Sequence, residues 1–212
     1  MTALARSLRA GAMALAASLM LGAVALAQDA PAMSAKDFVQ KVGNDAIHEL
    51  TDKSIPDNER VKRMRALLRA DFDEAAVSKF VLGTYWRLAT PEQRAEFQKL
   101  YEIVVAHNYA GLFKKYSGQT FQVLSERALD DKTTVVNAQI NQTDGNPPIP
   151  VEMQVQRNSP NWQATDIKVD GISMPQTHRK EYASVMNRSG VAGLLTAMRN
   201  KAQQLEAAEP SE

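Results

Sequence analysis

The chain has 212 residues, in which 25 Lys and Arg stand against 24 Asp and Glu, and it contains no cysteine. The lack of cysteine excludes disulfides, Cys-ligated metals and a thiol nucleophile, so stability has to come from an ordinary apolar core. The near balance of charge argues against nucleic acid as the partner and against strongly electrostatic membrane binding.

The first 27 residues have the pattern of a secretory signal peptide. Arg6 and Arg9 precede an apolar run from Ala10 to Ala23, and Ala25-Leu26-Ala27 supplies the small residues of a cleavage site. The run is shorter than the roughly 18 to 20 apolar residues of a membrane helix. The spacing of the arginines excludes a twin-arginine signal, and the lack of cysteine excludes a lipid-modified N-terminus. We therefore expect Sec-type export into a bacterial periplasm.

Helical periodicity dominates the first part of the mature chain. Apolar residues recur every three or four positions from Ser34 to about Asp71, with a break at Ser54-Ile55-Pro56-Asp57. We expect two helices there, with Ser34 and Asp57 as N-caps, and a short third helix from Asp71 to Phe80.

A strong helix start follows at Thr90-Pro91-Glu92-Gln93. Thr90 suits the N-cap, Pro91 the first helical position, and Gln93 the reciprocal position of a capping box. This sequence predicts a long amphipathic helix that ends near Ser117-Gly118.

After Gly118 the period changes from about 3.6 to 2, which indicates strands. Short turns separate four segments, so the pattern predicts an antiparallel meander with one buried face. Phe121 opens the first expected strand, Val136, Ala138 and Ile140 mark the second after a turn at Asp130-Asp131-Lys132, Ile149 opens the third, and the fourth runs from Trp162 to about Asp170.

Helical spacing returns from Pro175, with a break at Gly190 before a last helix. The fold class is therefore α+β, with a four-stranded antiparallel curved sheet wrapped by about six or seven helices in a roll. We expect residues 1–27 to be removed, residues 28–206 to form one domain, and residues 207–212 to be a disordered tail.

Recognisable catalytic motifs are absent from the sequence. His48, His107 and His178 are scattered without metal-ligand spacing, so we interpret them as solvated or locally hydrogen-bonded side chains. There is no Gly-rich phosphate loop and no nucleophile elbow. We expect no metal and no cofactor.

Carboxylates offer only a weak catalytic alternative. Asp71, Asp73 and Glu74 sit where the first turn of a helix commonly carries acids, and the helix dipole accounts for them. In a cone-shaped enzyme, Asp166 or Tyr109 would be the residue that moves a proton. Asp166 should, however, lie on the strand face opposite the apolar one.

Phe80–Arg87 reads FVLGTYWR and Ala89–Phe97 reads ATPEQRAEF, which together fit the pattern LGxYWRxATPEQRxxF, and Trp162–Met174 is similar to WxxxDVxVEGVSL. These segments together resemble the signatures of the MlaC, or toluene-tolerance, family of periplasmic phospholipid-binding proteins. The family's YRxxF…G pattern has its counterpart in Arg179, Tyr182 and Gly190. The likeness runs in order from about Ser34 to Leu205.

The resemblance implies a carrier and no enzyme. Members hold a phospholipid by its acyl chains in an apolar cavity between sheet and helices. They exchange it with an outer-membrane lipoprotein complex and an inner-membrane ABC transporter. Pro175-Gln176-Thr177-His178 departs from the family pattern, and a related branch is associated with hopanoids. The resemblance therefore leaves open a phospholipid or a hopanoid-type lipid.

Under this resemblance we expect the cavity to be lined by the apolar face of the sheet and by the helices that face it. A cation near the mouth would suit a phosphate headgroup, with Arg179 first and Arg87 second, although a surface ion pair explains either. A closed core uses the same residue types as a lipid cavity. A module with a closed core that binds only protein partners is therefore an alternative function that the sequence does not exclude. The expected lipid contacts are Phe80, Leu82, Tyr85, Val104, Tyr109, Phe113, Val136, Ala138, Ile140, Val151, Met153, Val155, Ile167, Val169, Ile172 and Met174.

Overall fold

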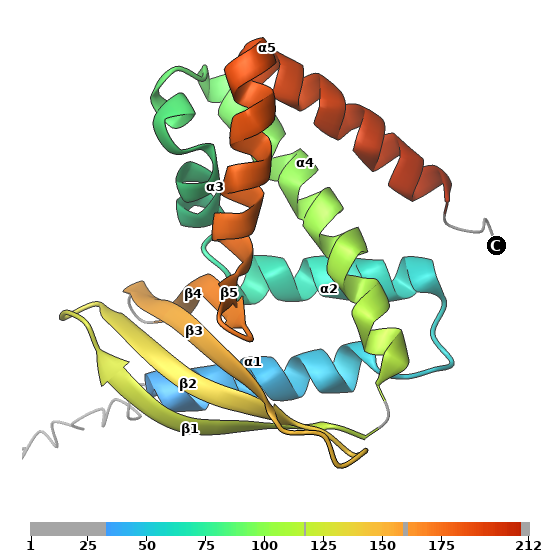
Figure 1. Ribbon diagram of the computed structural model, residues 1–212, viewed down its shortest axis with the longest axis vertical. Coiled ribbons are helices and arrows are strands. Elements are labelled where there is room, and N and C mark those ends of the chain that lie inside the picture. The colour runs from blue at the N-terminus through green and yellow to red at the C-terminus, as the bar shows by residue number, and fades with distance from the viewer. Residues whose placement is uncertain (1–32, 117, 159–160, 209–212) are drawn as a thin grey trace, which may run out of the picture. The chain divides into compact units, whose positions relative to one another are not determined.

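A computed structural model describes residues 33–116, 118–158 and 161–208 of the chain (Figure 1). The expected signal peptide, residues 209–212 and the Ser159-Pro160 turn lie outside these residues. The described elements are α1 (Ala35–Leu50), α2 (Asp57–Asp71), α3 (Glu74–Leu82), η1 (Gly83–Arg87), α4 (Pro91–Ala110), η2 (Gly111–Lys115), β1 (Thr120–Ala128), β2 (Thr133–Asn141), β3 (Ile149–Asn158), β4 (Asn161–Val169), β5 (Ile172–Ser173) and α5 (Met174–Ala207).

Two of the three N-caps that the sequence predicts are confirmed. Thr90 accepts a hydrogen bond from the backbone N–H of Gln93, whose side chain accepts one from the Thr90 backbone N–H, so the capping box of α4 is confirmed. Ser34 caps α1 as expected. Asp57 is not the N-cap of α2. It is the first helical residue after Pro56, which offers no side-chain cap, and its carboxylate pairs with Lys114.

The five strands form one antiparallel sheet in the order β1-β2-β3-β4-β5. Four of them are the expected meander, and the fifth is a two-residue strand that pairs with the end of β4. Register shifts at Val123/Ser125 and at Gln154/Val155 mark irregularities in two of the ladders. Such bulges bend a sheet and increase its twist, in agreement with the curved sheet that we expected.

One face of the sheet carries the apolar side chains. Burial alternates along β3, where Val151, Met153 and Val155 are buried between less buried neighbours. Helix α1 lies against this face and contributes Phe38 and Val39 to the shared cluster (Figure 1). The sheet is therefore apolar on the side that α1 partly covers.

The buried apolar residues fall into three clusters. One joins α3, α4 and α5 around Phe97 and Leu194. A second joins α1 to the sheet around Val136. A third joins α1, α2 and α4 around Leu50. In the described part of the chain, no helix is long and apolar enough to cross a membrane.

The expected break at Gly190 is confirmed. Its φ of 66° and ψ of −173° interrupt the helical geometry inside α5. This conformation is open to glycine and strained for residues with a Cβ atom. Apart from its chain neighbours and the adjacent helix backbone, no described residue has an atom within 4 Å of where a Cβ would stand, so the backbone conformation is what restricts this position.

Gly190→Ala should therefore lower the free energy of unfolding by about 1–3 kcal/mol, measured by urea denaturation. Gly111→Ala is the matched control, because Gly111 has an equally open Cβ position but a right-handed helical φ of −63°. That change should leave stability unchanged or raise it by about 0.4–1 kcal/mol. Equal effects of the two substitutions would contradict the assigned role of Gly190.

Candidate functional site

A cavity of about 660 Å³ lies between the three apolar clusters and is bounded by helices and by the apolar face of the sheet. Its apolar lining consists of Val42, Gly43, Ala46, Ile47, Met64, Leu67, Leu68, Phe72, Val77, Val105, Leu112, Phe113, Phe121, Ile140, Ile149, Val151, Met153, Ile167, Val169, Met174 and Pro175. Its polar lining consists of Asp71, Glu74, Ser78, Gln98, Tyr101, Glu102, Tyr109, Lys115, Tyr116, Gln119, Gln142 and His178.

Size and lining favour an apolar ligand. Small-molecule sites are typically about 300–1,000 Å³, with mostly apolar walls and a few placed polar groups. Across the described residues, no group of three or more His, Asp or Glu side chains is arranged to hold a metal ion. The cavity is therefore suited to hydrocarbon with one or a few polar atoms.

Eight of the sixteen residues expected to contact lipid line this cavity. The sheet supplies most of them, because alternate residues of β2, β3 and β4 point to the same face. The eight are Tyr109, Phe113, Ile140, Val151, Met153, Ile167, Val169 and Met174.

Five of the remaining residues are buried in packed structure. Val136, Ala138 and Val155 lie on the apolar side of the sheet but belong to the cluster with α1. Leu82 belongs to the cluster of α3, α4 and α5, and Val104 is buried outside the lining. Periodicity identifies the apolar face, but it does not say where along that face a helix packs and where a space remains.

The other three lie outside the cavity wall. The exposed fractions of Phe80 and Ile172 are 41% and 57%. Tyr85 packs beside the cluster of α3, α4 and α5, and its hydroxyl donates to Asn187 at 2.6 Å. Tyr85 and Ile172 fall in the short η1 and β5, where sequence periodicity is too brief to fix direction, whereas Phe80 lies on the exposed side of α3.

The two expected headgroup residues are brought together, but neither lines the cavity. Arg87 and Arg179 border a separate shallow pocket beside Phe80. The Arg179 guanidinium stacks over the Phe80 ring at 5.0 Å from its centroid. Lys115, on η2, is the only Lys or Arg in the described cavity lining.

Helices α1 and α2 supply cavity residues that the sequence analysis did not assign to the site. Val42, Ile47, Met64, Leu67 and Leu68 appear in the sequence only as the apolar stripes of two amphipathic helices. A stripe that faces a core and one that faces a cavity look the same in sequence.

His178 is buried in the cavity wall, in contrast to the solvated or locally bonded histidine that we expected. Its Nδ1 lies 2.7 Å from the Tyr101 hydroxyl and its Nε2 lies 3.2 Å from the Tyr109 hydroxyl. The Tyr109 hydroxyl also donates to the Met174 sulfur at 3.1 Å. Burial lowers the pKa of His178 and raises the pKa of Tyr101, so both are neutral near pH 7.

Acidic groups also reach the cavity. Asp71 ends α2, which corrects its assignment to a helix first turn, while Asp73 caps α3 and Glu74 begins that helix. Within the described residues, Asp71 Oδ2, Glu74 Oε1 and Ser78 Oγ are buried without a hydrogen-bond partner. Burial raises the pKa of Asp71 and of Glu74. The ionised carboxylates of Asp71 and Glu74 therefore destabilise the fold.

A third acidic side chain in the cavity wall is paired with two arginines. Glu102, on α4, accepts hydrogen bonds from Arg65 at 2.5 Å and from Arg69 at 3.0 Å, both on α2. The enzyme candidate Asp166 does not line the cavity, as expected for the other strand face, and it accepts a hydrogen bond from Ser173 at 2.8 Å.

Asp71→Asn should raise the melting temperature at pH 8 by about 2–4 °C, the equivalent of about 1 kcal/mol in a domain of this size. The folded-state pKa of Asp71 is raised, so its stability contribution is present below the unfolded pKa and is lost as pH rises through the folded pKa. The gain from the substitution should therefore shrink toward pH 4.

Asp130→Asn is the control of opposite sign. Backbone N–H groups of Lys132 and Thr133 donate to Asp130 and lower its pKa, so its contribution is present at neutral pH and is lost as pH falls. This variant should melt lower than the parent at pH 8 and match it in acid. Thermal melts from pH 4 to 8 measure both, and parallel pH profiles would contradict the assignment.

Comparisons with known proteins agree on one family. The MlaC protein family matches residues 40–200. The intermembrane phospholipid transport system binding protein MlaC of Haemophilus influenzae is 31% identical over 134 residues, covering 62% of each chain. The toluene tolerance protein ttg2D of Pseudomonas putida is 27% identical over 119 residues, covering 56% of this chain and 55% of that protein. The match therefore spans about three fifths of the length of these curated relatives.

A solved structure has the same fold. It is a phospholipid-binding protein from Ralstonia solanacearum in complex with a phospholipid, with a TM-score of 0.71 and 23% sequence identity. The match covers 82% of this chain and 99% of that chain. The family match over residues 40–200 shows that the chain belongs to the MlaC family, and this structure shows the same fold.

Proposed function

We propose that this protein is a periplasmic carrier that holds a phospholipid by its acyl chains in the cavity. The observation that carries the proposal is the 660 Å³ space with its apolar lining, which supplies hydrocarbon contacts from both sheet and helices. The relatives are named for phospholipid transport and phospholipid binding, which supports the same conclusion. The eight expected residues in the lining are the proposed tail contacts.

The physical need for such a carrier follows from the hydrophobic effect. Two acyl chains carry roughly 30 methylenes, and at about 0.8 kcal/mol each their transfer to water costs on the order of 24 kcal/mol. Non-covalent affinities saturate at about 18–21 kcal/mol. The lipid should therefore leave the cavity by handover while the carrier is docked at a membrane partner.

The route and the partners belong to the same proposal. The N-terminal pattern of residues 1–27 supports export into the periplasm. By analogy with the transport system named for the Haemophilus influenzae relative, we infer exchange between an outer-membrane lipoprotein complex and an inner-membrane ABC transporter. A hopanoid-type lipid in the same cavity is the second candidate ligand. Membership of a transport family argues against a cone-fold enzyme.

Native mass spectrometry of protein purified from its periplasm, with fragmentation of the released ligand, tests the proposal. We expect about one diacyl phospholipid per protein. A polycyclic lipid would replace the phospholipid by a hopanoid and keep the carrier function. An empty protein that also takes no lipid from vesicles would contradict the proposal.

Ile140→Trp should weaken lipid binding by about tenfold or more, because overpacking a filled site costs about 1–3 kcal/mol. Ile140 lines the cavity from β2. Gln139→Trp is the matched control. Gln139 is next to Ile140 in β2, but its side chain points to the opposite face of the sheet and donates a hydrogen bond to Asn141. Transfer of a fluorescent phospholipid from vesicles measures both variants. Equal losses would argue that lipid binds elsewhere.

A further inference from the structure

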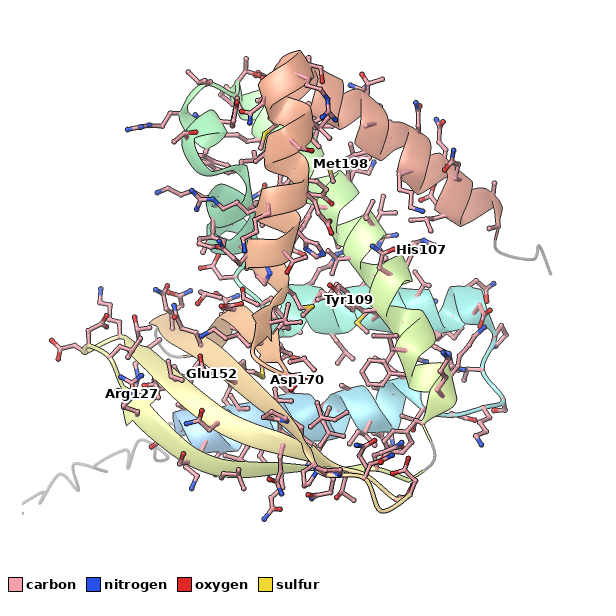
Figure 2. The ribbon with its side chains drawn as sticks, in the orientation of Figure 1. His107, Tyr109, Arg127, Glu152, Asp170 and Met198 are labelled. Carbon is pink, nitrogen blue, oxygen red and sulfur yellow. The ribbon has the colours of Figure 1, made fainter. Side chains whose placement is uncertain are left out.

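Inside the apolar cavity, the hydroxyls of Tyr101 and Tyr109 are joined through His178. These three residues come from α4 and α5 and are all part of the cavity lining. Figure 2 labels Tyr109 where α4 passes α2. The donors and acceptors of each side chain determine which group donates in each of these hydrogen bonds.

Tyr101 fixes the direction of the first hydrogen bond. It is 9% exposed, and its only hydrogen-bond partner among the described residues is His178 Nδ1. A buried hydroxyl that only accepted would keep an unpaired O–H, which is unfavourable. Tyr101 therefore donates to Nδ1, and a neutral imidazole then carries its proton on Nε2.

The second hydrogen bond runs from His178 to Tyr109. With its proton on Nε2, His178 donates to the Tyr109 oxygen at 3.2 Å, which leaves the Tyr109 O–H to donate onward. Its acceptor in the protein is the sulfur of Met174 at 3.1 Å. The reverse direction would leave the Tyr101 O–H unpaired, so one arrangement satisfies all three donors.

The last acceptor in this chain is a poor one. A thioether accepts hydrogen bonds weakly, whereas a carbonyl oxygen is a strong acceptor. Met174 also has a flexible side chain and can give way to another group. Tyr109 thus offers a strong, oriented donor in a cavity whose other walls are mostly hydrocarbon.

We propose that Tyr109, oriented by His178 and Tyr101, forms a polar subsite that donates a hydrogen bond to an ester carbonyl of the bound lipid. This inference rests on the proposed carrier function and adds a selectivity to it. Acyl chains attached by ester bonds should be preferred over alkyl chains attached by ether bonds, because the ether linkage lacks the carbonyl. Tyr109 is the residue that touches the lipid, and His178 and Tyr101 are positioning residues.

Competition between two synthetic lipids tests the subsite. The protein is incubated with vesicles that hold equal amounts of ester-linked and ether-linked phosphatidylethanolamine with the same chain length, and the captured lipid is identified by mass spectrometry. A hydrogen bond of ordinary strength predicts an ester preference of about 2- to 10-fold. Tyr109→Phe should bring the two lipids to equal occupancy, because the ring stays in the cavity wall and only the hydroxyl is removed.

Tyr85→Phe is the matched control, because Tyr85 donates to Asn187 outside the cavity lining and the variant should keep the preference. Equal capture of the two lipids by the parent protein, or an unchanged preference in Tyr109→Phe, would overturn the subsite but leave the carrier function. Capture of neither lipid would contradict the carrier function and the subsite with it.

The direction of the hydrogen bonds from Tyr101 through His178 to Tyr109 can be measured separately. Nitrogen-15 NMR of the imidazole distinguishes the two neutral tautomers, and we expect His178 as the Nε2–H form, with Nδ1 acting as an acceptor. This measurement needs no lipid, so it separates the geometry of the wall from ligand binding. An Nδ1–H form would overturn the proposed direction of the hydrogen bonds.

Discussion

The one-sided apolar face of the antiparallel sheet has to be shielded from water, and α1 covers only part of it. Where α1 lies close, Phe38 and Val39 pack against sheet residues such as Val136. Farther along the face, Val151, Met153 and Ile167 meet the cavity as well. The other helices close over this remaining area without filling it, because α3, α4 and α5 pack on one another in one cluster and α2 and α4 pack with the end of α1 in another.

The order and type of the elements could be predicted from the sequence because their signals are local. The Thr90–Gln93 capping box, the change of period after Gly118 and the turn at Gly190 each depend on a few neighbouring residues. The start of α2 was misplaced at Asp57, since a polar residue near a helix start looks like a cap whether or not its side chain turns back.

The cavity was harder to predict because it is a property of packing. Val136 and Met153 are both inward-facing sheet residues, yet only Met153 reaches the cavity. His178 and Asp71 looked like ordinary polar residues, because their burial depends on elements far apart in the chain. Among the expected contacts, five of the eight residues in the long strands line the cavity, whereas those in α3, η1 and β5 lie outside its wall.

The division of the apolar residues into three clusters affects where the domain opens locally. Helix α1 contributes to two of the clusters and α4 to two, so these helices link the clusters, and a local opening would fall between the clusters and not inside one of them. The free energy of such a local opening is smaller than that of global unfolding. The same division lowers the cooperativity of the domain, and hydrogen exchange in its helices need not follow exchange in its sheet.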